Sequence, residues 1–306
     1  MQTPSKSALE MADQIISASA PEAGIAIVAG ITTELVIQAQ TRHALAPTAT
    51  AAVGRLITAA ALLGTALKGR ERLSLQIAGD GPLRAVVADV MLLPDGTVGV
   101  RGYAKNGDVD VPLNARGKFD VAAAVGSGSL QVTKSYEVGQ PYVGIVPLVS
   151  GEIGDDVASY LANSQQIPSV VAVGVLANPN GVIAAGGVIG QVMPGADERV
   201  VAHLEERALA MRPVTEQVAN GAGPADLLAA LAGDMVIKHE RTIDVKFACR
   251  CTLEKVEIAL LGLGKDELLK IACEQPETAA TCEFCKTTYT LSARDVSALV
   301  QRLDKG

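Results

Sequence analysis

The chemistry of this chain is concentrated in its five cysteines, which all fall between residues 249 and 285. One residue separates Cys249 from Cys251, two residues separate Cys282 from Cys285, and Cys273 lies alone between these pairs. Four thiolates in two pairs suit tetrahedral Zn²⁺, whose Zn–S bonds are about 2.3 Å long. No histidine is close enough in sequence to compete as a ligand. The spacing therefore predicts one zinc ion bound by Cys249, Cys251, Cys282 and Cys285.

Other roles for these cysteines fit less well. Structural disulfides do not persist in a reducing cytoplasm. A dithiol of the thioredoxin type needs its cysteine pair at a helix N-terminus, whereas residues 287–291 are predicted as a strand and Ser292 with Asp295 as the cap of a final helix. A purely structural zinc clamp stays open as an alternative. Cys273, on the apolar face of a helix over 266–272, is expected to be a buried or bystander thiol.

No catalytic site is predicted, and we expect a protein that is not an enzyme. Residues 262–265 resemble a phosphate-binding loop only faintly, because Asp266 follows the lysine where Ser or Thr is required. They are interpreted as a turn between two helices, and residues 126–129 as a surface loop. The histidines are isolated from one another and from paired acids, and each is expected to be structural: His43, His203 and His239.

Composition describes a globular chain with a small-residue core. The 306 residues are 49% hydrophobic and 19% charged, with no Trp, three Phe and five Tyr, so the core must be built from Ala, Val, Leu and Ile. The net charge of -7 opposes the phosphate backbone and argues against nucleic acid as a partner. The first six residues carry no apolar run after a positive charge, and the long uncharged stretch over 157–196 contains too many Asn, Gln and Pro residues to cross a membrane. We expect a soluble cytoplasmic protein.

The first 196 residues indicate an α+β domain with mixed helices and sheet. A buried helix follows Pro47, with apolar residues at helical spacing as far as Leu67, and a second helix is predicted over 155–163. Alternating apolar residues and turn signals predict a meander of strands over 73–77, 83–90 and 98–103. Two further buried strands, over 170–176 and 182–185, are joined by a turn at residues 178–181.

Beyond residue 196 the pattern becomes helical. A helix with one charged face begins near Asp197, and Pro213 and Pro224 each stand at a predicted first helical position. Helices this short need packing against another element. The predicted organisation is a core domain over 1–196, a helical linker over 197–242, and a small zinc-binding redox-switch domain over 243–306.

Motifs along nearly the whole chain resemble the heat shock protein 33 family, a group of redox-regulated holdase chaperones. Besides the cysteine pairs, the resemblance rests on these segments: Leu261 to Leu268, Gly54-Arg55-Leu56, Gly79 to Leu83, Pro141 to Leu148, Gly151-Glu152-Ile153, Ala185-Gly186-Gly187 with Gln191, and Pro194-Gly195-Ala196. The resemblance implies an ATP-independent chaperone that is inactive while reduced and zinc-bound. Oxidation would release the metal and activate the chain to bind unfolding proteins as a homodimer, with no role for nucleic acid or membrane.

The resemblance also implies how the switch works. Cys249 would pair with Cys251 and Cys282 with Cys285 in disulfides, and the loss of zinc would unfold the tail. An unfolded tail would no longer cover the linker helices, whose apolar side chains would become exposed: Val200, Val201, Leu204, Leu227, Leu228 and Leu231.

Two other classes of protein stay open at this point. One is a zinc-module protein that binds nucleic acid or a fixed protein partner without redox switching. It is disfavoured by the acidic charge balance and by the lack of aromatic residues interleaved with Lys or Arg. The other is a thiol oxidoreductase, which would turn over small disulfides.

Overall fold

The computed structural model describes residues 12–178, 180–197 and 199–303. The N-terminal residues used to argue against a leader, and Pro179 of the predicted turn, lie outside these ranges. The chain divides into two compact units, Met1–Ala248 and Cys249–Gly306, which we call unit 1 and unit 2. The predicted α+β class, with a small C-terminal unit that carries the four paired cysteines, is confirmed.

Unit 1 contains a ten-stranded sheet in the order β7-β6-β3-β4-β5-β10-β1-β2-β9-β8. Neighbouring strands are antiparallel except β5 and β10, which pair in parallel. The strands are β1 (Gln14–Ala20), β2 (Ile25–Ile31), β3 (Arg72–Gly79), β4 (Ala85–Leu92), β5 (Val98–Ala104), β6 (Gly128–Ser135), β7 (Tyr142–Pro147), β8 (Ser169–Asn178), β9 (Gly181–Val192) and β10 (Lys238–Phe247). The predicted meander and the hairpin of β8 and β9 are confirmed. Residues 128 and 129, predicted as loop, instead begin β6 because they pair with β3.

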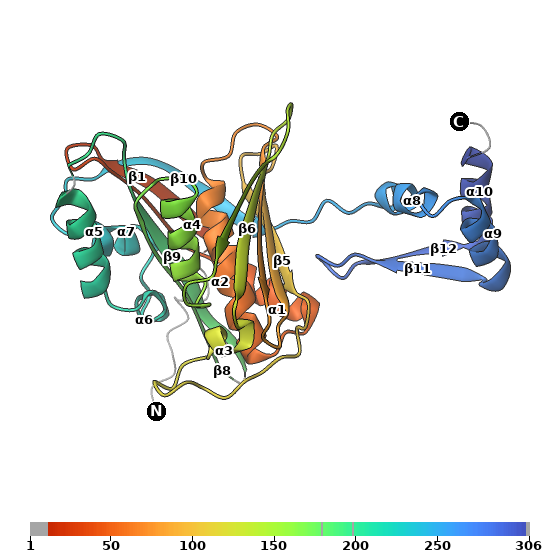
Figure 1. The fold of residues 1–306 in the computed structure, drawn as a ribbon, viewed down its shortest axis with the longest axis horizontal. Helices are drawn as coiled ribbons and strands as arrows, with labels where there is room; N and C mark the ends of the chain where they lie inside the picture. Colours follow the sequence, from red (N-terminus) through yellow and green to blue (C-terminus); the bar gives the residue numbers. More distant parts are fainter. Residues whose placement is uncertain (1–11, 179, 198, 304–306) are drawn as a thin grey trace. The chain divides into compact units, whose positions relative to one another are not determined.

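The helices of unit 1 pack on this sheet (Figure 1). They are α1 (Thr33–His43), α2 (Pro47–Gly64), α3 (Val121–Val125), α4 (Gly154–Asn163), α5 (Arg199–Ala210), α6 (Val214–Ala219) and α7 (Pro224–Ala232). Pro224 is the first residue of α7, as predicted, whereas Pro213 caps α6 one position earlier than predicted.

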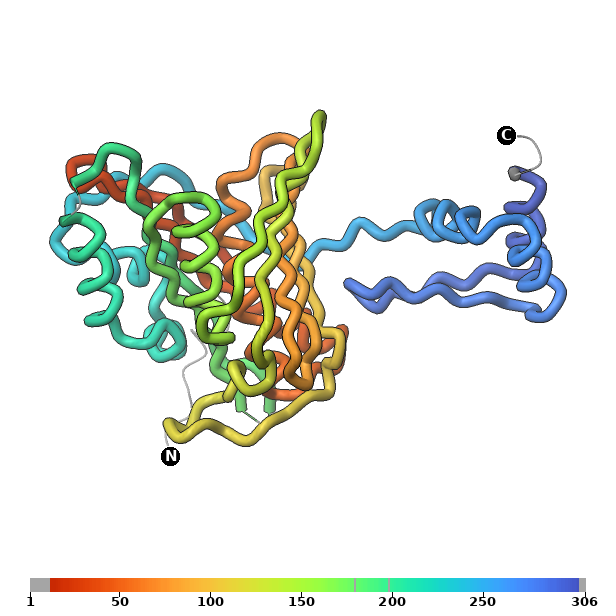
Figure 2. Tube along the Cα trace, in the orientation of Figure 1, coloured from red at the N-terminus to blue at the C-terminus, as the bar shows by residue number. Residues whose placement is uncertain are grey.

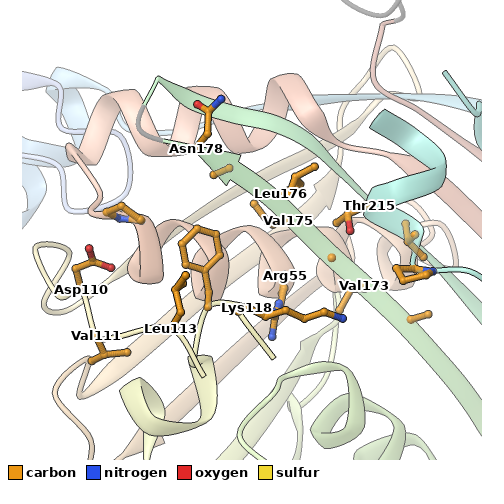
Figure 3. Close-up of a pocket in the computed structure, with 18 of the residues that line it drawn as sticks. Arg55, Asp110, Val111, Leu113, Lys118, Val173, Val175, Leu176, Asn178 and Thr215 are labelled. Carbon is orange, nitrogen blue, oxygen red and sulfur yellow. The ribbon is translucent and has the colours of Figure 1, made fainter. Parts of the chain in front are cut away.

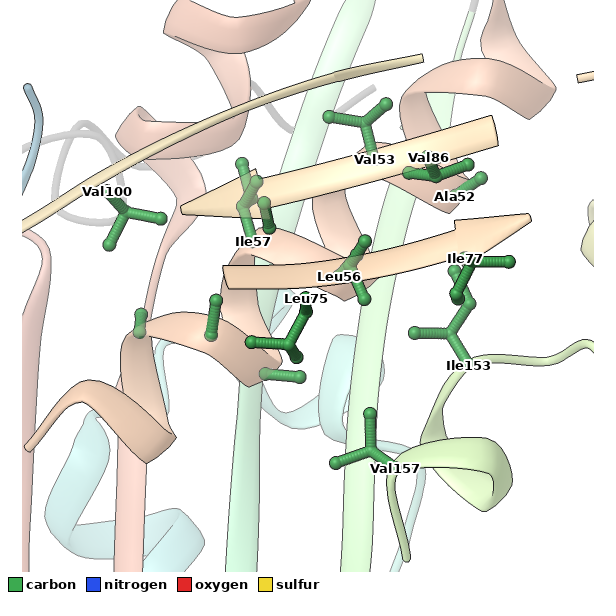
Figure 4. Close-up of a cluster of buried hydrophobic side chains, with 14 of the residues drawn as sticks. Ala52, Val53, Leu56, Ile57, Leu75, Ile77, Val86, Val100, Ile153 and Val157 are labelled. Atoms are coloured by element: carbon green, nitrogen blue, oxygen red, sulfur yellow. The ribbon is translucent and has the colours of Figure 1, made fainter. Parts of the chain in front are cut away.

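The core of unit 1 forms around α2, which contacts β3, β4 and β5 in one half of the sheet and β8 and β9 in the other. Its Val53, Leu56 and Ile57 are fully buried, and Figure 4 shows them among side chains from the strands and from the start of α4. By length and composition α2 could pass for a membrane span, but 83% of it is buried inside the protein, as in a core helix. Ala and Gly along this helix allow the strands to approach closely: Val90 would lie 2.4 Å from a Cβ at Gly64.

Helices α5 to α7 cover a second apolar cluster on β1, β2 and β9. Leu204, Leu227 and Leu231 are at most 1% exposed there. These side chains were expected to be covered by the zinc module, but the sheet of unit 1 buries them. The reason is that strands β1, β2 and β9 present a complementary apolar face of Ala, Val and Ile residues.

Strand β10 corrects the predicted domain boundary. The boundary between residues 242 and 243 falls inside β10, and the two units divide after Ala248. Ile243 and Val245 are 9% and 7% exposed because β10 inserts between β5 and β1 in the middle of the sheet. Figure 2 shows β10, in light blue, beside the red N-terminal strand β1. Residues 197–242 therefore belong to unit 1 rather than to a separate linker.

Unit 2 consists of α8 (Leu253–Leu261), α9 (Lys265–Glu274), a hairpin of β11 (Glu277–Thr281) and β12 (Thr288–Ser292), and α10 (Ala293–Leu303). The predicted turn between the first two helices and the predicted final helix are both present. Ser292 donates its backbone N–H to the Asp295 carboxylate at 2.9 Å, and the Asp295 N–H donates to the Ser292 hydroxyl at 3.2 Å. The buried core is small: Leu268, Leu291, Val296, Leu299 and Val300.

The placement of β10 in the sheet predicts that Ile243→Ala destabilises unit 1. Truncating a buried Ile leaves a cavity and costs about 2–5 kcal/mol. Urea unfolding followed by circular dichroism, with metal kept bound to unit 2, would measure it. Thr242→Ala, on the exposed neighbouring position of the same strand, is the control and is expected to change the unfolding free energy by less than about 0.5 kcal/mol. Equal midpoints for both variants would place β10 outside the cooperative core.

Candidate metal centre

The two cysteine pairs reach one place from two different elements of unit 2. Cys251 immediately precedes Thr252, which caps α8 by accepting the Lys255 backbone N–H at 3.3 Å. The second pair lies in the turn between β11 and β12. There the Cys282 N–H donates to the Thr287 carbonyl at 2.9 Å, and the Lys286 N–H donates to the Cys282 carbonyl at 2.8 Å.

The geometry of the cluster brings all four predicted ligands together. The Sγ atoms of Cys249, Cys251, Cys282 and Cys285 lie within 4.8 Å of one another. Cys249 and Cys282 are 3.7 Å apart at sulfur, and Cys251 and Cys285 are 3.3 Å apart. Bonds of about 2.3 Å in tetrahedral geometry separate ligand sulfurs by roughly 3.8 Å, so these positions match a common metal ion without large movement. All five cysteines lie in the described residues, and none forms a disulfide.

Two residues that the sequence analysis did not single out complete the cluster. The Tyr289 hydroxyl donates to Cys251 Sγ at 3.2 Å, and Cys285 Sγ lies 3.3 Å from the Thr287 hydroxyl. Both residues follow the second cysteine pair: Thr287 directly precedes β12, and Tyr289 lies within it. Hydrogen-bonding groups of this kind orient the metal ligands and tune their basicity.

The electrostatics of the thiols favour a bound cation. Burial raises the pKa of Cys251 to about 12 and also raises the pKa of Cys282. Burial acts in the same direction on Cys285, but hydrogen bonds with Thr287 and Cys251 outweigh it and lower the pKa of Cys285 to about 6. The hydrogen bond to Cys251 raises the pKa of Tyr289 to about 12, so the phenol stays a donor. The cluster thus stabilises one negative charge, on Cys285, and disfavours ionisation of Cys251 and Cys282. A divalent cation reverses this balance, because a coordinated thiol ionises outright.

Cys273 is separate from this cluster. It is exposed on α9 and is absent from the group of four sulfurs. Of the two roles expected for it, a buried or a bystander thiol, this position agrees with the bystander. Leu268, Ile271 and Ala272 form the packed face of α9, and Cys273 points away from them.

Known proteins match this chain over nearly its whole length. Residues 13–292 match the family model described as Hsp33 protein. The chain belongs to the Hsp33 family. It is 41% identical over 292 residues to the 33 kDa chaperonin of Ruminiclostridium cellulolyticum, covering 95% of this chain and 99% of that protein. It is 44% identical over 297 residues to the 33 kDa chaperonin of a Picosynechococcus species, covering 96% and 98%.

A solved structure gives the same result. The Hsp33 homologue of Thermotoga maritima, titled a 33 kDa chaperonin, aligns with a TM-score of 0.87 at 34% identity, covering 97% of this chain and all of that one. Membership in the Hsp33 family supports a chaperone role for this protein, and its four-cysteine cluster could hold a metal ion.

The cluster predicts the metal content of the reduced Hsp33 chain. We expect one Zn²⁺ per chain in the native protein, and loss of more than about a hundredfold in zinc affinity in Cys285→Ser, since removing a direct ligand costs more than the 10–100-fold typical of outer contacts. Competition with a chromophoric chelator would measure both values. Cys273→Ser is the matched control and should keep full affinity. Tight, stoichiometric zinc in Cys285→Ser would exclude this ligand set.

Proposed function

We propose that this Hsp33 chain is a redox-regulated, ATP-independent holdase. In the reduced state Cys249, Cys251, Cys282 and Cys285 bind one zinc ion and the chaperone is inactive. Oxidation of these cysteines releases the metal and activates binding of unfolding proteins. The observation that carries the proposal is the cluster of four sulfurs within 4.8 Å, inside a unit whose described residues include a buried core of five side chains.

The metal, when bound, would hold the four sulfurs ionised and balance their charge. A domain this small rarely folds on its core alone, and structural zinc supplies about 10–16 kcal/mol in peptide systems. The fold of unit 2 would therefore depend on the thiolates remaining reduced. A purely structural zinc site would stabilise unit 2 to the same extent. The proposed function differs from it in that release of the zinc activates the chaperone.

The oxidative step uses the side chains of the cluster. One thiolate attacks peroxide, which breaks the O–O bond, forms a sulfenic acid and releases hydroxide. A second thiolate attacks that sulfur, forms the disulfide and displaces another hydroxide. Each disulfide thus consumes one peroxide and two electrons from two sulfurs. We propose the pairs Cys249–Cys251 and Cys282–Cys285, because partners one or two residues apart stay close after unit 2 unfolds.

The helices α5 to α7 are the proposed conditional element. Helix α6 spans only six residues, and α5 has one buried side chain, Leu204. Their stability comes from packing on β1, β2 and β9. Strand β10 connects α7 to unit 2 and ends at Phe247, two residues before Cys249. Unfolding of unit 2 would therefore begin two residues beyond the end of β10. Release of these helices would expose an apolar face that binds unfolding clients.

We further propose that oxidised chains form a homodimer in the cytoplasm and bind no nucleic acid or membrane. The net charge of -7 supports the absence of nucleic-acid binding. The described residues offer no catalytic constellation besides the sulfur cluster, and we propose no enzymatic turnover.

The proposed function predicts the outcome of an aggregation assay without ATP. Reduced, zinc-loaded protein should leave the aggregation of a thermally unfolding client unchanged, and peroxide-treated protein should suppress it at near-equal molar ratio. Zinc release and free thiols are followed in the same samples. Cys273→Ala should behave as the native chain. Equal suppression before and after peroxide would contradict redox control, and turnover of small disulfides would favour an oxidoreductase.

The conditional element predicts a pattern of hydrogen exchange. Amides from Val200 to Leu231 should lose protection on oxidation, because local unfolding of marginal helices precedes that of the core. Amides of β3 and β4, which lie in the middle of one half of the sheet, are the internal control and should keep their protection. Unchanged protection of the helices in an oxidised sample with chaperone activity would place the client surface elsewhere.

A further inference from the structure

A cavity of about 780 Å³ lies in unit 1, apart from the metal centre (Figure 3). Its walls are the loop over residues 110–119, strand β8, and the start of α6, and Arg55 of α2 forms part of its floor. Small-molecule sites typically enclose about 300–1,000 Å³ with mainly apolar walls and a few convergent polar groups. The cavity has this size and composition.

The loop is anchored to α2 through Asp110. The Asp110 carboxylate accepts the Thr48 backbone N–H at 3.2 Å and the Thr48 hydroxyl at 2.7 Å. These bonds cap the N-terminus of α2 and keep the loop beside the helix. The charge of Asp110 is thus engaged at one end of the cavity, away from Arg55 and Lys118 in Figure 3.

The other end of the cavity is cationic. Arg55 is 13% exposed and pairs with Glu152, while its Nε is buried without a hydrogen-bond partner. Figure 3 shows the nitrogens of Arg55 and Lys118 on the same side, and both residues also line an adjoining hollow that Asp110 does not reach. In the described part of the chain no acid pairs with the Lys118 ammonium. Arg116 and Asp155 also line that hollow. Its three basic and two acidic side chains, with Glu152 paired to Arg55, leave one net positive charge at this end.

The space between these ends is apolar and borders a free strand edge. Leu113 and Leu176 are 57% and 37% exposed at its rim, and Val175 and Val214 are buried in its walls. The seven consecutive residues 172–178 all line it. Alternate side chains of a strand point to opposite faces, so the cavity lies against the edge of β8, which pairs only with β9.

We propose that this cavity binds an amphipathic carboxylate, an aliphatic or aromatic acid with one negative charge. Its carboxylate lies at the end formed by Arg55 and Lys118, and its apolar part covers Leu113 and Leu176. The single uncompensated charge matches a monoanion, and burial of the exposed apolar rim supplies the remaining affinity.

Binding would also act on the conditional helices. Val214 and Thr215 of α6 line the cavity together with the core strand β8, so a bound acid contacts both elements at once. A ligand that binds only when α6 is docked stabilises the docked state by mass action. The acid is therefore an inhibitor of activation, an inference that rests on the proposed release of these helices.

Calorimetric titration of the reduced, zinc-loaded full chain with decanoate tests the site. We expect one decanoate per chain, and about tenfold weaker binding in Lys118→Glu, where a charge-assisted contact is replaced by repulsion. Leu113→Asp, on the exposed rim, should weaken binding by a similar factor because it places a charge beside the apolar chain. Both substitutions are at exposed loop positions and leave the core intact.

Two controls distinguish binding at this site from nonspecific binding that depends on overall charge or on hydrophobicity. Lys105→Glu makes the same charge change at an exposed lysine outside the cavity and should bind decanoate as the native chain does. Decanol, which lacks the acid, should bind at least about tenfold more weakly. No decanoate binding, or equal affinity in all three variants, would overturn the site. Equal affinity for decanol would overturn the assignment of an acid.

Hydrogen exchange tests the coupling separately. With decanoate at ten times its dissociation constant, exchange at Gln217 and Val218 of α6 should slow about tenfold, and activation by peroxide should slow with it. Binding without protection of α6 would overturn the coupling. Protection of α6 in a protein that never gains chaperone activity on oxidation would reject the proposed function and leave the acid site standing.

Discussion

The charge balance of four sulfurs in a small volume governs the C-terminal unit. Ionised sulfurs within 4.8 Å repel one another strongly at the reduced dielectric constant of a protein. Hydrogen bonds with Thr287 and Cys251 stabilise one negative charge, on Cys285. A metal ion is therefore needed if all four are to be thiolates together. Without a metal most of the sulfurs are protonated, or they are oxidised in pairs, and in either case the metal–sulfur bonds that would join the α8 segment to the β11–β12 turn are absent.

Unit 1 has the opposite balance. Its ten-stranded sheet packs against the apolar helix α2. Its main buried cluster consists of apolar side chains around that helix. No metal-ligating cluster is present among its described residues. Loss of a metal from the cluster would therefore remove a central interaction of unit 2 and leave the apolar core around α2 in place. This division of stabilising forces allows a chain to unfold in part and remain folded elsewhere.

The features that were predicted correctly from the sequence depend on the spacing of residues that are close together in the chain. The cysteine pairs, the helix after Pro47 and the capping of the last helix by Ser292 and Asp295 all depend on residues close together in the chain. Strand β10 was missed because its partners are distant: Gln14 pairs with Asp244, and Val98 with Val245. Tyr289 was missed because its direction depends on the hairpin register. Cys273 was misplaced because it lies five positions after Leu268, which is about 140° around the helix.

The extent of packing differs among the helices α5 to α7. Leu227 and Leu231 of α7 are packed as closely as side chains in the main core, whereas α6 begins beside the 780 Å³ cavity, where Val214 and Thr215 border open space rather than packed side chains. Contacts that a cavity leaves unmade are a loss of packing energy. Helix α5 has one buried side chain and α6 has three, so α6 is well packed on its sheet side and lacks contacts only where it borders the cavity and the free edge of β8. A ligand in that volume would add contacts between α6 and β8, so under the proposed function it would oppose the release of helices that oxidation of the sulfur cluster would promote.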